Sequence, residues 1–455
     1  MSDRTFDPLC AGSSVENAEL AEDGRVDSAT STNSAIPPAR EAAYPKDSVL
    51  ETFMAFAREY SESEDAMLIG AVLPVVSRLL ARRVFIRFAG RKYPNLYSLL
   101  VTKPGLRKST NINLVARLAR ALLPHNAFTG GATSEQALFK QYLVQPDKLL
   151  IESEGNTVLA NWASDSAGKI VAKRYLDLYD CSAWQQNYIK QEEENGEAMQ
   201  RIEQTSTSLL IGTTFNNCRF HGLETRDGMR RRVCYYVSED FARTIYWPPD
   251  LDGEEFARVV AAFQPLAELA GEMKLSHEAR ALWDGLQDGN REEIRGIQEI
   301  DSAAEAYGSA LAEEQSKTLK LAMIFEACRW AADKTRECRE IQRDTLELAA
   351  AHGRYCLGAG QSLDAIGRRG EIREQADAIL ANIRTEFAAQ VKEGKIELNR
   401  TQLTHRFAAN PGRPGAMTPG RLYSEIIPDL AKRGLARSLP KAGKLNAYQF
   451  DAADK

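Results

Sequence analysis

Apolar residues recur at helical spacing from Asp47 to about Arg83, in the stretches "SVLETFMAFAREY" and "DAMLIGAVLPVVSRLLARR". This periodicity predicts two helices, and Pro74 is expected to kink or split the second one. The short apolar run "VFIRF" that follows is typical of a strand. We therefore interpret residues 46–94 as a helical N-terminal subdomain.

Further along the chain, short apolar runs predict strands that alternate with helices. A helix is expected in 110–123, and strands are expected in 95–102 "NLYSLLVT", 147–162 "DKLLIESEGNTVLANW", 207–217 "TSLLIGTTFNN" and 230–237 "RRRVCYYV". Such alternation is typical of a mostly parallel sheet with helices on both faces. The pattern predicts an α/β core over residues 95–250, and a core without nucleotide chemistry is the alternative.

The C-terminal half contains two further patterns. Residues 251–370 carry amphipathic helical patterns, which predict a helical domain packed on the core, either as a lid or as a scaffold without a site. Residues 371–455 follow the order helix, strand, helix, turn, helix and hairpin, and the last helix opens with Thr418 and Pro419. Threonine before a helix and proline at its first position are good start signals. This order of elements predicts a winged helix.

Composition limits the class of protein. The chain has 455 residues, 44% hydrophobic and 27% charged, which is ordinary for a soluble protein of two or three domains. Its seven cysteines form no CxxC pair and its five histidines are dispersed, so we expect no zinc module. We expect a cytoplasmic protein without a membrane partner, because no apolar run has membrane-spanning length and no basic-apolar leader is present.

The formal net charge of −5 is unevenly distributed along the chain. Residues 1–45 hold eight acidic and three basic side chains, with few large apolar residues, which predicts a disordered acidic tail. Residues 397–455 hold ten Lys or Arg against five Asp or Glu, so the predicted winged helix is basic. Basic faces are typical of DNA binding, although winged helices also dock proteins. The expected DNA contacts are Arg413, Arg421, Lys432, Arg433, Arg437, Lys441 and Lys444.

The stretch "LLVTKPGLRKST" connects an apolar strand to a helix and resembles a phosphate-binding loop. In such loops backbone N–H groups bind the phosphates, a lysine reaches the β- and γ-phosphates, and the next hydroxyl holds Mg²⁺. Thr102 and Arg107 occupy the positions of the two glycines in GxxxxGK[ST]. A positive φ there would cost a non-glycine residue about 1–2 kcal/mol, which a phosphate contact by Arg107 could offset. The candidate ATP-binding residues are Pro104, Gly105, Arg107, Lys108, Ser109 and Thr110, with Ser109 also on Mg²⁺.

Hydrolysis also requires carboxylates at the end of a neighbouring strand. The stretch "LLIESEG" offers Glu154 as the general base and Glu152 as a carboxylate on the Mg²⁺ side. Alternation along a strand would put both side chains on the same face. Two solvated loop carboxylates are the alternative.

Two further stretches are candidates for the same site. The strand "LLIGTTFNN" ends in Thr213, Thr214 and Asn216, which could contact the γ-phosphate or the attacking water, or could be an ordinary strand exit. Arg230, Arg231 and Arg232 are expected at the start of a strand. In ring ATPases an arginine of one subunit completes the site of the next, although a basic triplet is more often a solvated edge.

Several stretches in order resemble a family of RecA-like P-loop ATPases that occur in phage, plasmid and genomic-island proteins beside replicative helicases and primases. They are "YPNLYSLLVTKPGLRKST", "FTGGATSEQALF", "LLIESEG", "YLDLYDCSAW", "TSLLIGTTF" and "DGMRRRVCYY", within roughly residues 47–360. The resemblance implies ATP, Mg²⁺, a homo-oligomeric ring such as a hexamer, and movement on DNA. It implies phosphate-loop roles for Lys108 and Ser109 and a catalytic role for Glu154. It also implies a sensor role for Thr214 and an arginine role for Arg232.

Three functions fit these patterns. The first is an ATP-driven DNA helicase or translocase of a phage or mobile element. Because no primase-like motif precedes the core, it would act alone or with a separate primase. The second is a nucleotide-switched replication initiator or loader that hydrolyses ATP slowly. The third is a DNA-binding scaffold without enzymatic activity.

Overall fold

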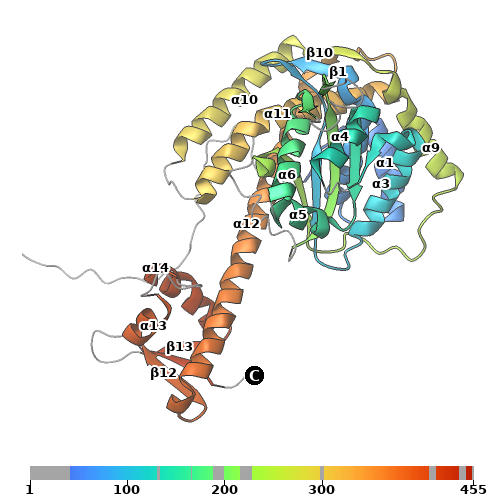
Figure 1. Cartoon of the computed structure of the whole chain (residues 1–455). Coiled ribbons are helices and arrows are strands. Elements are labelled where there is room, and N and C mark those ends of the chain that lie inside the picture. The colour runs from blue at the N-terminus through green and yellow to red at the C-terminus, as the bar shows by residue number, and fades with distance from the viewer. Residues whose placement is uncertain are drawn as a thin grey trace, which may run out of the picture.

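The computed structural model describes residues 41–130, 134–164, 166–187, 199–215, 228–297, 302–408, 417–439 and 447–452. A sheet lies at the centre of the main body, with helices around it (Figure 1). It has five strands in the order β4-β5-β8-β3-β9, and all neighbouring strands are parallel. The strands are β3 (Tyr97–Thr102), β4 (Phe128–Thr129), β5 (Asp147–Glu152), β8 (Ser206–Thr214) and β9 (Val233–Ser238). The predicted α/β fold with a parallel sheet is confirmed.

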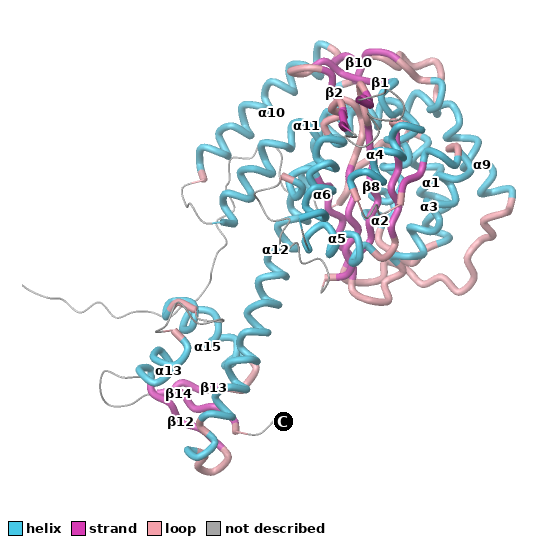
Figure 2. Tube along the Cα trace, viewed as in Figure 1, coloured by secondary structure: helices cyan, strands magenta, loops and turns pink. Residues whose placement is uncertain are grey.

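Helices cover both faces of this sheet, as Figure 2 shows. Successive side chains of β3 belong to two apolar layers, with Leu100 in one and Leu99 and Val101 in the other. One layer includes α1 (Val49–Tyr60), α2 (Asp65–Leu80), α3 (Lys108–Leu122) and α9 (Glu254–Phe263). The other includes α4 (Glu135–Val144), α5 (Gly155–Ser164) and α6 (Ser166–Tyr179).

Residues 46–94, predicted as a helical N-terminal subdomain, contain α1 and α2. Nearly every residue of α2 is buried, and this helix packs on β3, β8 and β9. A helix that is apolar all round is typical of a core position. Pro74 lies inside α2 without dividing it.

A second, smaller sheet connects distant parts of the chain. Its order is β11-β10-β1-β2, and β1 pairs in parallel with β10. The strands are β1 (Val84–Arg87), β2 (Arg91–Lys92), β10 (Gly271–Leu275) and β11 (Glu340–Ile341). Residues 251–370 are therefore not wholly helical. The short segment "GEMKL" carries no strong periodicity of its own and becomes a strand because β1 lies beside it.

Long helices complete the main body, and α11 packs along α12. The remaining helices and strands here are α8 (Met229–Arg232), α10 (His277–Gly296), α11 (Ser302–Ala332), α12 (Arg343–Glu386), β6 (Trp184–Asn187) and β7 (Met199–Ile202). Short 3₁₀ turns lie at Ala81–Arg83, His125–Ala127, Gln264–Glu268 and Ala388–Gln390. Of the predicted disordered tail, residues 1–40 lie outside the described residues. Ala42 and Tyr44 are buried, and the carbonyl of Ala43 lies 2.7 Å from His352 Nδ1.

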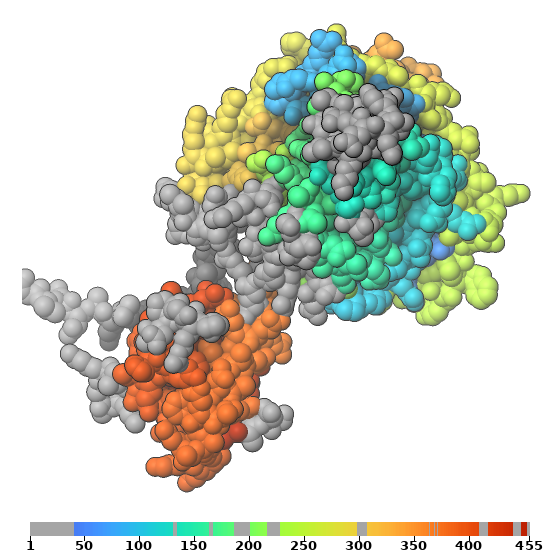
Figure 3. All heavy atoms as spheres, in the orientation of Figure 1, coloured from blue at the N-terminus to red at the C-terminus, as the bar shows by residue number. Residues whose placement is uncertain are grey.

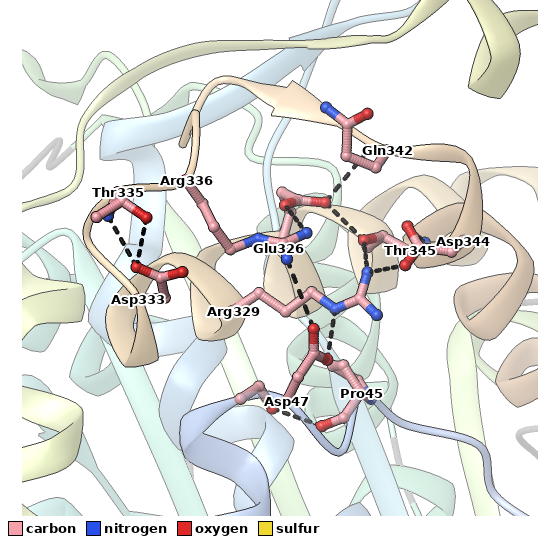
Figure 4. Close-up of polar contacts among 11 residues, drawn as sticks. Pro45, Asp47, Glu326, Arg329, Asp333, Thr335, Arg336, Gln342, Asp344 and Thr345 are labelled. Atoms are coloured by element: carbon pink, nitrogen blue, oxygen red, sulfur yellow. Dashed lines mark hydrogen bonds and ion pairs between the residues drawn. The ribbon is translucent and has the colours of Figure 1, made fainter.

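A partly buried polar network connects α11 and α12 to Asp47, which precedes α1 (Figure 4). Arg329 donates to Asp47, to Asp344 and to the hydroxyl of Thr345, at 2.9, 2.8 and 2.6 Å. That hydroxyl in turn donates to Glu326 at 2.6 Å. Because Glu326 and Arg329 are both buried, Thr345 connects two charges that need hydrogen-bond partners.

Replacing Thr345 by valine should lower the free energy of unfolding of the main body by about 1.5–3 kcal/mol, the usual contribution of hydrogen bonds to charged groups. Urea denaturation followed by tryptophan emission measures the change. Thr335→Val is the matched control, because the Thr335 hydroxyl donates to Asp333 at the exposed surface. Equal midpoints for the two variants would show that the network does not stabilise the fold.

The C-terminal lobe is built around the end of α12 and stands away from the main body (Figure 3). A three-stranded antiparallel sheet has the order β12-β14-β13. The lobe contains β12 (Lys395–Asn399), α13 (Arg400–Phe407), α14 (Pro419–Arg421), a π-helical stretch (Leu422–Ile426), α15 (Ile427–Lys432), β13 (Ala436–Leu439) and β14 (Ala447–Asp451). The domain boundary predicted between 370 and 371 falls inside α12, so the lobe and the body share one helix.

The middle of α12 contains two glycines, which have low helix propensity. Gly367 and Gly370 lie in an exposed stretch, and a Cβ added at either would meet no atom within 4 Å. Packing therefore does not require these glycines, and each costs the helix about 1 kcal/mol relative to alanine.

Gly367→Ala combined with Gly370→Ala should slow amide hydrogen exchange across residues 361–374, because both changes favour the helical state. Hydrogen–deuterium exchange with mass spectrometry measures this. Gly360→Ala is the matched control on the same helix, because its added Cβ would lie 3.1 Å from the Tyr235 ring and gain little. If the double variant exchanges its amide hydrogens at the wild-type rate, the two glycines do not destabilise the middle of α12.

Candidate nucleotide-binding site

The loop 103–107 joins the carboxyl end of β3 to the first turn of α3. Gly105 has a φ of +90° and Arg107 a φ of +58°. Arg107 therefore adopts the left-handed conformation that the sequence pattern assigns to glycine, at an expected cost of about 1–2 kcal/mol. Its guanidinium Nε donates to Glu62 Oε2 at 2.8 Å. This bond lowers the pKa of Glu62 and holds the Arg107 side chain on that carboxylate.

Lys108 is the first residue of α3, and its side chain is only 7% exposed. Burial lowers the pKa of its ammonium, and the negative charge of Glu154 opposes that shift. Among the described residues no hydrogen bond or ion pair satisfies the ammonium. The alkyl stem of Lys108 is buried and its ammonium has no described partner, so the ammonium is available to form a charge-assisted hydrogen bond with an anion bound at this position.

The central strand β8 makes room for this lysine. A Cβ built on Gly212 would lie 2.8 Å from Lys108 Cδ and 2.5 Å from Ile112 Cδ1. Only glycine allows the lysine to lie flat across the strand. A glycine inside the apolar run "LLIGTTF" can indicate that another group packs closely on the strand, but this contact with Lys108 was not predicted from the sequence.

The first turn of α3 contributes further groups. Ser109 and Thr110 are half-buried, and no side chain caps the helix. The first backbone N–H groups of a helix have no partner within the helix, and its dipole favours anions at this end. Pro104 and Gly105 form the exposed turn in front of them. The structure thus brings the predicted phosphate-loop residues together at one helix end.

The two carboxylates lie beside this helix end, with one correction. β5 ends at Glu152, and Glu154 belongs to the turn before α5, so they are not alternate residues of one strand. The turn arises because Glu152 Oε1 accepts a hydrogen bond from the backbone N–H of Glu154 at 3.2 Å. Glu154 is exposed and contributes to the potential at Lys108.

Glu152 faces a cavity of about 510 Å³ between α3 and the ends of β4 and β5. The lining residues are Ile112, Asn113, Ala116, Arg120, Leu123, His125, Phe128, Thr129, Ile151, Glu152 and Ser153. The α3 residues of this lining begin at Ile112, one turn after Lys108.

β8 lies between the strand of the phosphate loop and the strand of the carboxylates. Thr214 pairs in register with Thr102, and it shares a face with Gly212 because side chains alternate along a strand. Thr213 points to the other face, where its hydroxyl donates to Asn156 Oδ1 at 2.7 Å. Thr214 is thus on the side of Lys108, and Asn216 lies outside the described residues.

Arg232 does not lie near Lys108. Arg230, Arg231 and Arg232 form the short helix α8 and not the predicted strand start, because Gly228 adopts a left-handed conformation that begins a helical turn. Arg232 precedes the residue paired with Tyr97, so it lies at the amino ends of the strands, opposite the phosphate loop. Its buried guanidinium donates to Asp180 at 2.7 Å. The structure does not bring Arg232 to Lys108, and a role in a neighbouring subunit stays a prediction.

The groups around Lys108 fit Mg²⁺ in the way that nucleotide sites bind it. Mg²⁺ prefers oxygen ligands and is usually held by one or two protein groups, water and the substrate phosphates. Ser109 and Glu152 would supply the protein oxygens. No cluster of three or more His, Cys, Asp or Glu is present among the described residues, so a site formed by protein ligands alone is not found there.

The predicted DNA contacts are divided between free and paired side chains. Arg421 pairs with Glu425 at 3.2 Å, and Arg433 donates to Asp429 at 3.1 Å and to Asp377. Lys432 and Arg437 are exposed. Arg413, Lys441 and Lys444 lie outside the described residues.

No family model and no curated protein matches this sequence. The resemblance to RecA-like ATPases therefore stays a prediction. Within the described part of the chain, no helix combines the length and the hydrophobicity needed to cross a bilayer.

Proposed function

We propose that this chain is an ATP-dependent motor that moves on DNA, with a RecA-like P-loop core and a C-terminal winged helix. The supporting observation is Lys108, a largely buried lysine at the N-terminus of α3 whose ammonium has no described hydrogen-bond partner. The sheet order supports the same assignment, because β8 brings Thr214 between the phosphate loop and the carboxylates. The phage or mobile-element setting, and a primase as partner, rest on the sequence resemblance alone.

In the proposed reaction, water attacks the γ-phosphorus of ATP and the bond to the β,γ-bridging oxygen breaks. Glu154 accepts a proton from the attacking water. Lys108 and the first N–H groups of α3 stabilise the charge on the phosphate oxygens, and Thr214 orients the γ-phosphate. Mg²⁺, when bound through Ser109 and on the side of Glu152, would neutralise phosphate charge.

The two arginines that the sequence suggested for the site, Arg107 and Arg232, are both paired within this subunit, which is compatible with an arginine supplied by a second subunit. Arg107 is bound to Glu62, and Arg232 is bound to Asp180 at the other edge of the sheet. Phosphoryl transfer is accelerated when an arginine from a neighbouring subunit stabilises the transition state. This supports a homo-oligomeric ring such as a hexamer.

Steady-state ATP hydrolysis with and without single-stranded DNA tests the proposal. Turnover should rise with DNA, and the rise should weaken as salt increases, because phosphate contacts depend on salt. Reversing the charge of the exposed residues Lys432 and Arg437 should reduce this rise while turnover without DNA is kept. Arg87→Glu, on the surface of the main body, is the control. A rate of ATP hydrolysis that DNA does not change at any salt concentration would contradict a DNA motor.

A nucleotide-switched initiator or loader is the second candidate. The observation that favours it is Arg107, which replaces a phosphate-loop glycine and whose guanidinium is held on Glu62. A loop that binds ATP but stabilises the transition state poorly would turn over slowly. ATP-dependent DNA binding with little turnover, in the same assay, would favour this function over the motor.

A further inference from the structure

Two adjacent aromatic side chains are fully open to solvent beside the candidate site. Tyr246 and Trp247 are 93% and 89% exposed, in the loop that connects β9 to α9. By contrast, Trp162, Trp184 and Trp283 are buried in the main body. Large aromatic rings are rarely left fully exposed on a fixed loop unless they contact a ligand or partner.

The loop is held in place by the segment that precedes α2. Its backbone N–H groups at Ala242 and Ile245 donate to the carbonyl and the carboxylate of Glu62, at 2.9 and 3.3 Å. Arg243 forms an ion pair of 2.6 Å with Asp65. Pro248 and Pro249 follow Trp247 directly, and proline restricts both itself and the residue before it. The aromatic pair is therefore presented by a stiff backbone.

Glu62 also connects this loop to the phosphate loop. One carboxylate oxygen accepts from Arg107, next to Lys108, and the other accepts from Ile245, next to Tyr246. A second connection joins Lys103 to the carbonyl of Glu239 at 3.0 Å. These hydrogen bonds hold the loop of the aromatic pair against the loop that precedes Lys108.

We propose that Tyr246 and Trp247 form the platform on which the nucleobase of the bound nucleoside triphosphate stacks. This inference rests on the proposed function, because the phosphates of that nucleotide would bind at Lys108. Aromatic side chains accept any base through its π-face and provide no hydrogen-bond readout. The platform would therefore bind ATP and GTP with similar affinity, and would distinguish nucleotides from inorganic triphosphate.

Affinities for Mg·ATP and for Mg·inorganic triphosphate test the platform. In Trp247→Ala, ATP binding should weaken roughly 5- to 150-fold, which is the usual contribution of one base stacked on an aromatic ring. Binding of inorganic triphosphate should not change. Trp247→Phe should restore most of the ATP affinity, and Phe241→Ala, an exposed aromatic of the same loop, is the matched control.

Tryptophan emission provides a second readout. ATP should quench the emission of the wild-type protein, the quenching should be absent from Trp247→Phe, and inorganic triphosphate should cause none. Equal losses for ATP and triphosphate would assign Trp247 a structural role and overturn the platform. Unchanged ATP affinity in Trp247→Ala would also overturn the platform. If this variant instead binds single-stranded DNA more weakly, the surface binds DNA. If its sedimentation changes, the surface contacts a second copy of the chain.

The same measurements separate the platform from the proposed function. If the wild-type protein binds ATP and inorganic triphosphate equally well, the platform is wrong and the phosphate site remains. If it binds neither, both inferences are wrong.

Discussion

Replacing Lys108 by alanine is expected to abolish detectable ATP binding and to lower ATP turnover by at least about 10²- to 10³-fold, the usual effect of removing one preorganised donor at a developing charge. The ammonium lies at the N-terminus of α3, where the helix dipole also favours phosphate. Calorimetry with Mg·ATP and a steady-state assay measure the two effects.

The stability of this variant gives an independent signal. The ammonium of Lys108 has no described partner, but its stem packs against Gly212, so Lys108→Ala should melt close to the wild-type temperature when no nucleotide is present. Mg·ATP should raise the melting temperature of the wild type only, because ligands stabilise the state that binds them.

Two further variants sharpen this test. Lys103→Ala removes an exposed lysine of the same loop and should leave binding intact. Gly212→Ala keeps Lys108 but introduces a Cβ against its side chain, and should weaken ATP binding. Normal turnover in Lys108→Ala would place the nucleotide site elsewhere, and absence of binding in the wild type would leave a DNA-binding scaffold.

Glu154→Gln is expected to lower turnover by about 10²- to 10⁴-fold while ATP binding is kept, because the amide cannot accept the proton of the attacking water. Glutamine has nearly the same shape, so the turn before α5 should be preserved. The loss of the negative charge near Lys108 should lower the pKa of its ammonium, and ATP, itself an anion, should bind at least as tightly.

Glu152→Gln is the matched control at the end of the same strand. It should shift the Mg²⁺ concentration needed for turnover and leave saturated turnover much less affected than Glu154→Gln. If both variants change only the Mg²⁺ dependence, Glu154 is not the general base. If neither changes turnover, the two are solvated loop carboxylates.

Local patterns in the sequence were sufficient to predict the central parallel sheet and the succession of strand, loop and helix around Lys108. The apolar run 95–102, the turn at Pro104 and the helix after Lys108 lie next to one another in the chain, so their relation is visible in the sequence. The pattern of phosphate loops assigns a glycine to position 107, and Arg107 has the positive φ that a glycine would adopt there.

Contacts between distant segments could not be predicted in this way. β1 pairs with β10, and Glu62 connects Arg107 to Ile245, although no periodicity relates these segments. Arg232 lies at the amino ends of the strands, away from Lys108, because β9 runs parallel to β3 and Arg232 precedes its first residue.

The continuity of α12 has a consequence for how this protein can vary in length. Each residue of an α-helix turns the chain by about 100°, so one residue added to the exposed middle of α12 would rotate the C-terminal lobe by about that angle relative to the body. An addition of about seven residues, close to two whole turns, would move the lobe outward while keeping the same face toward the body. Helical phase therefore restricts the lengths at which this connector preserves the orientation of the lobe.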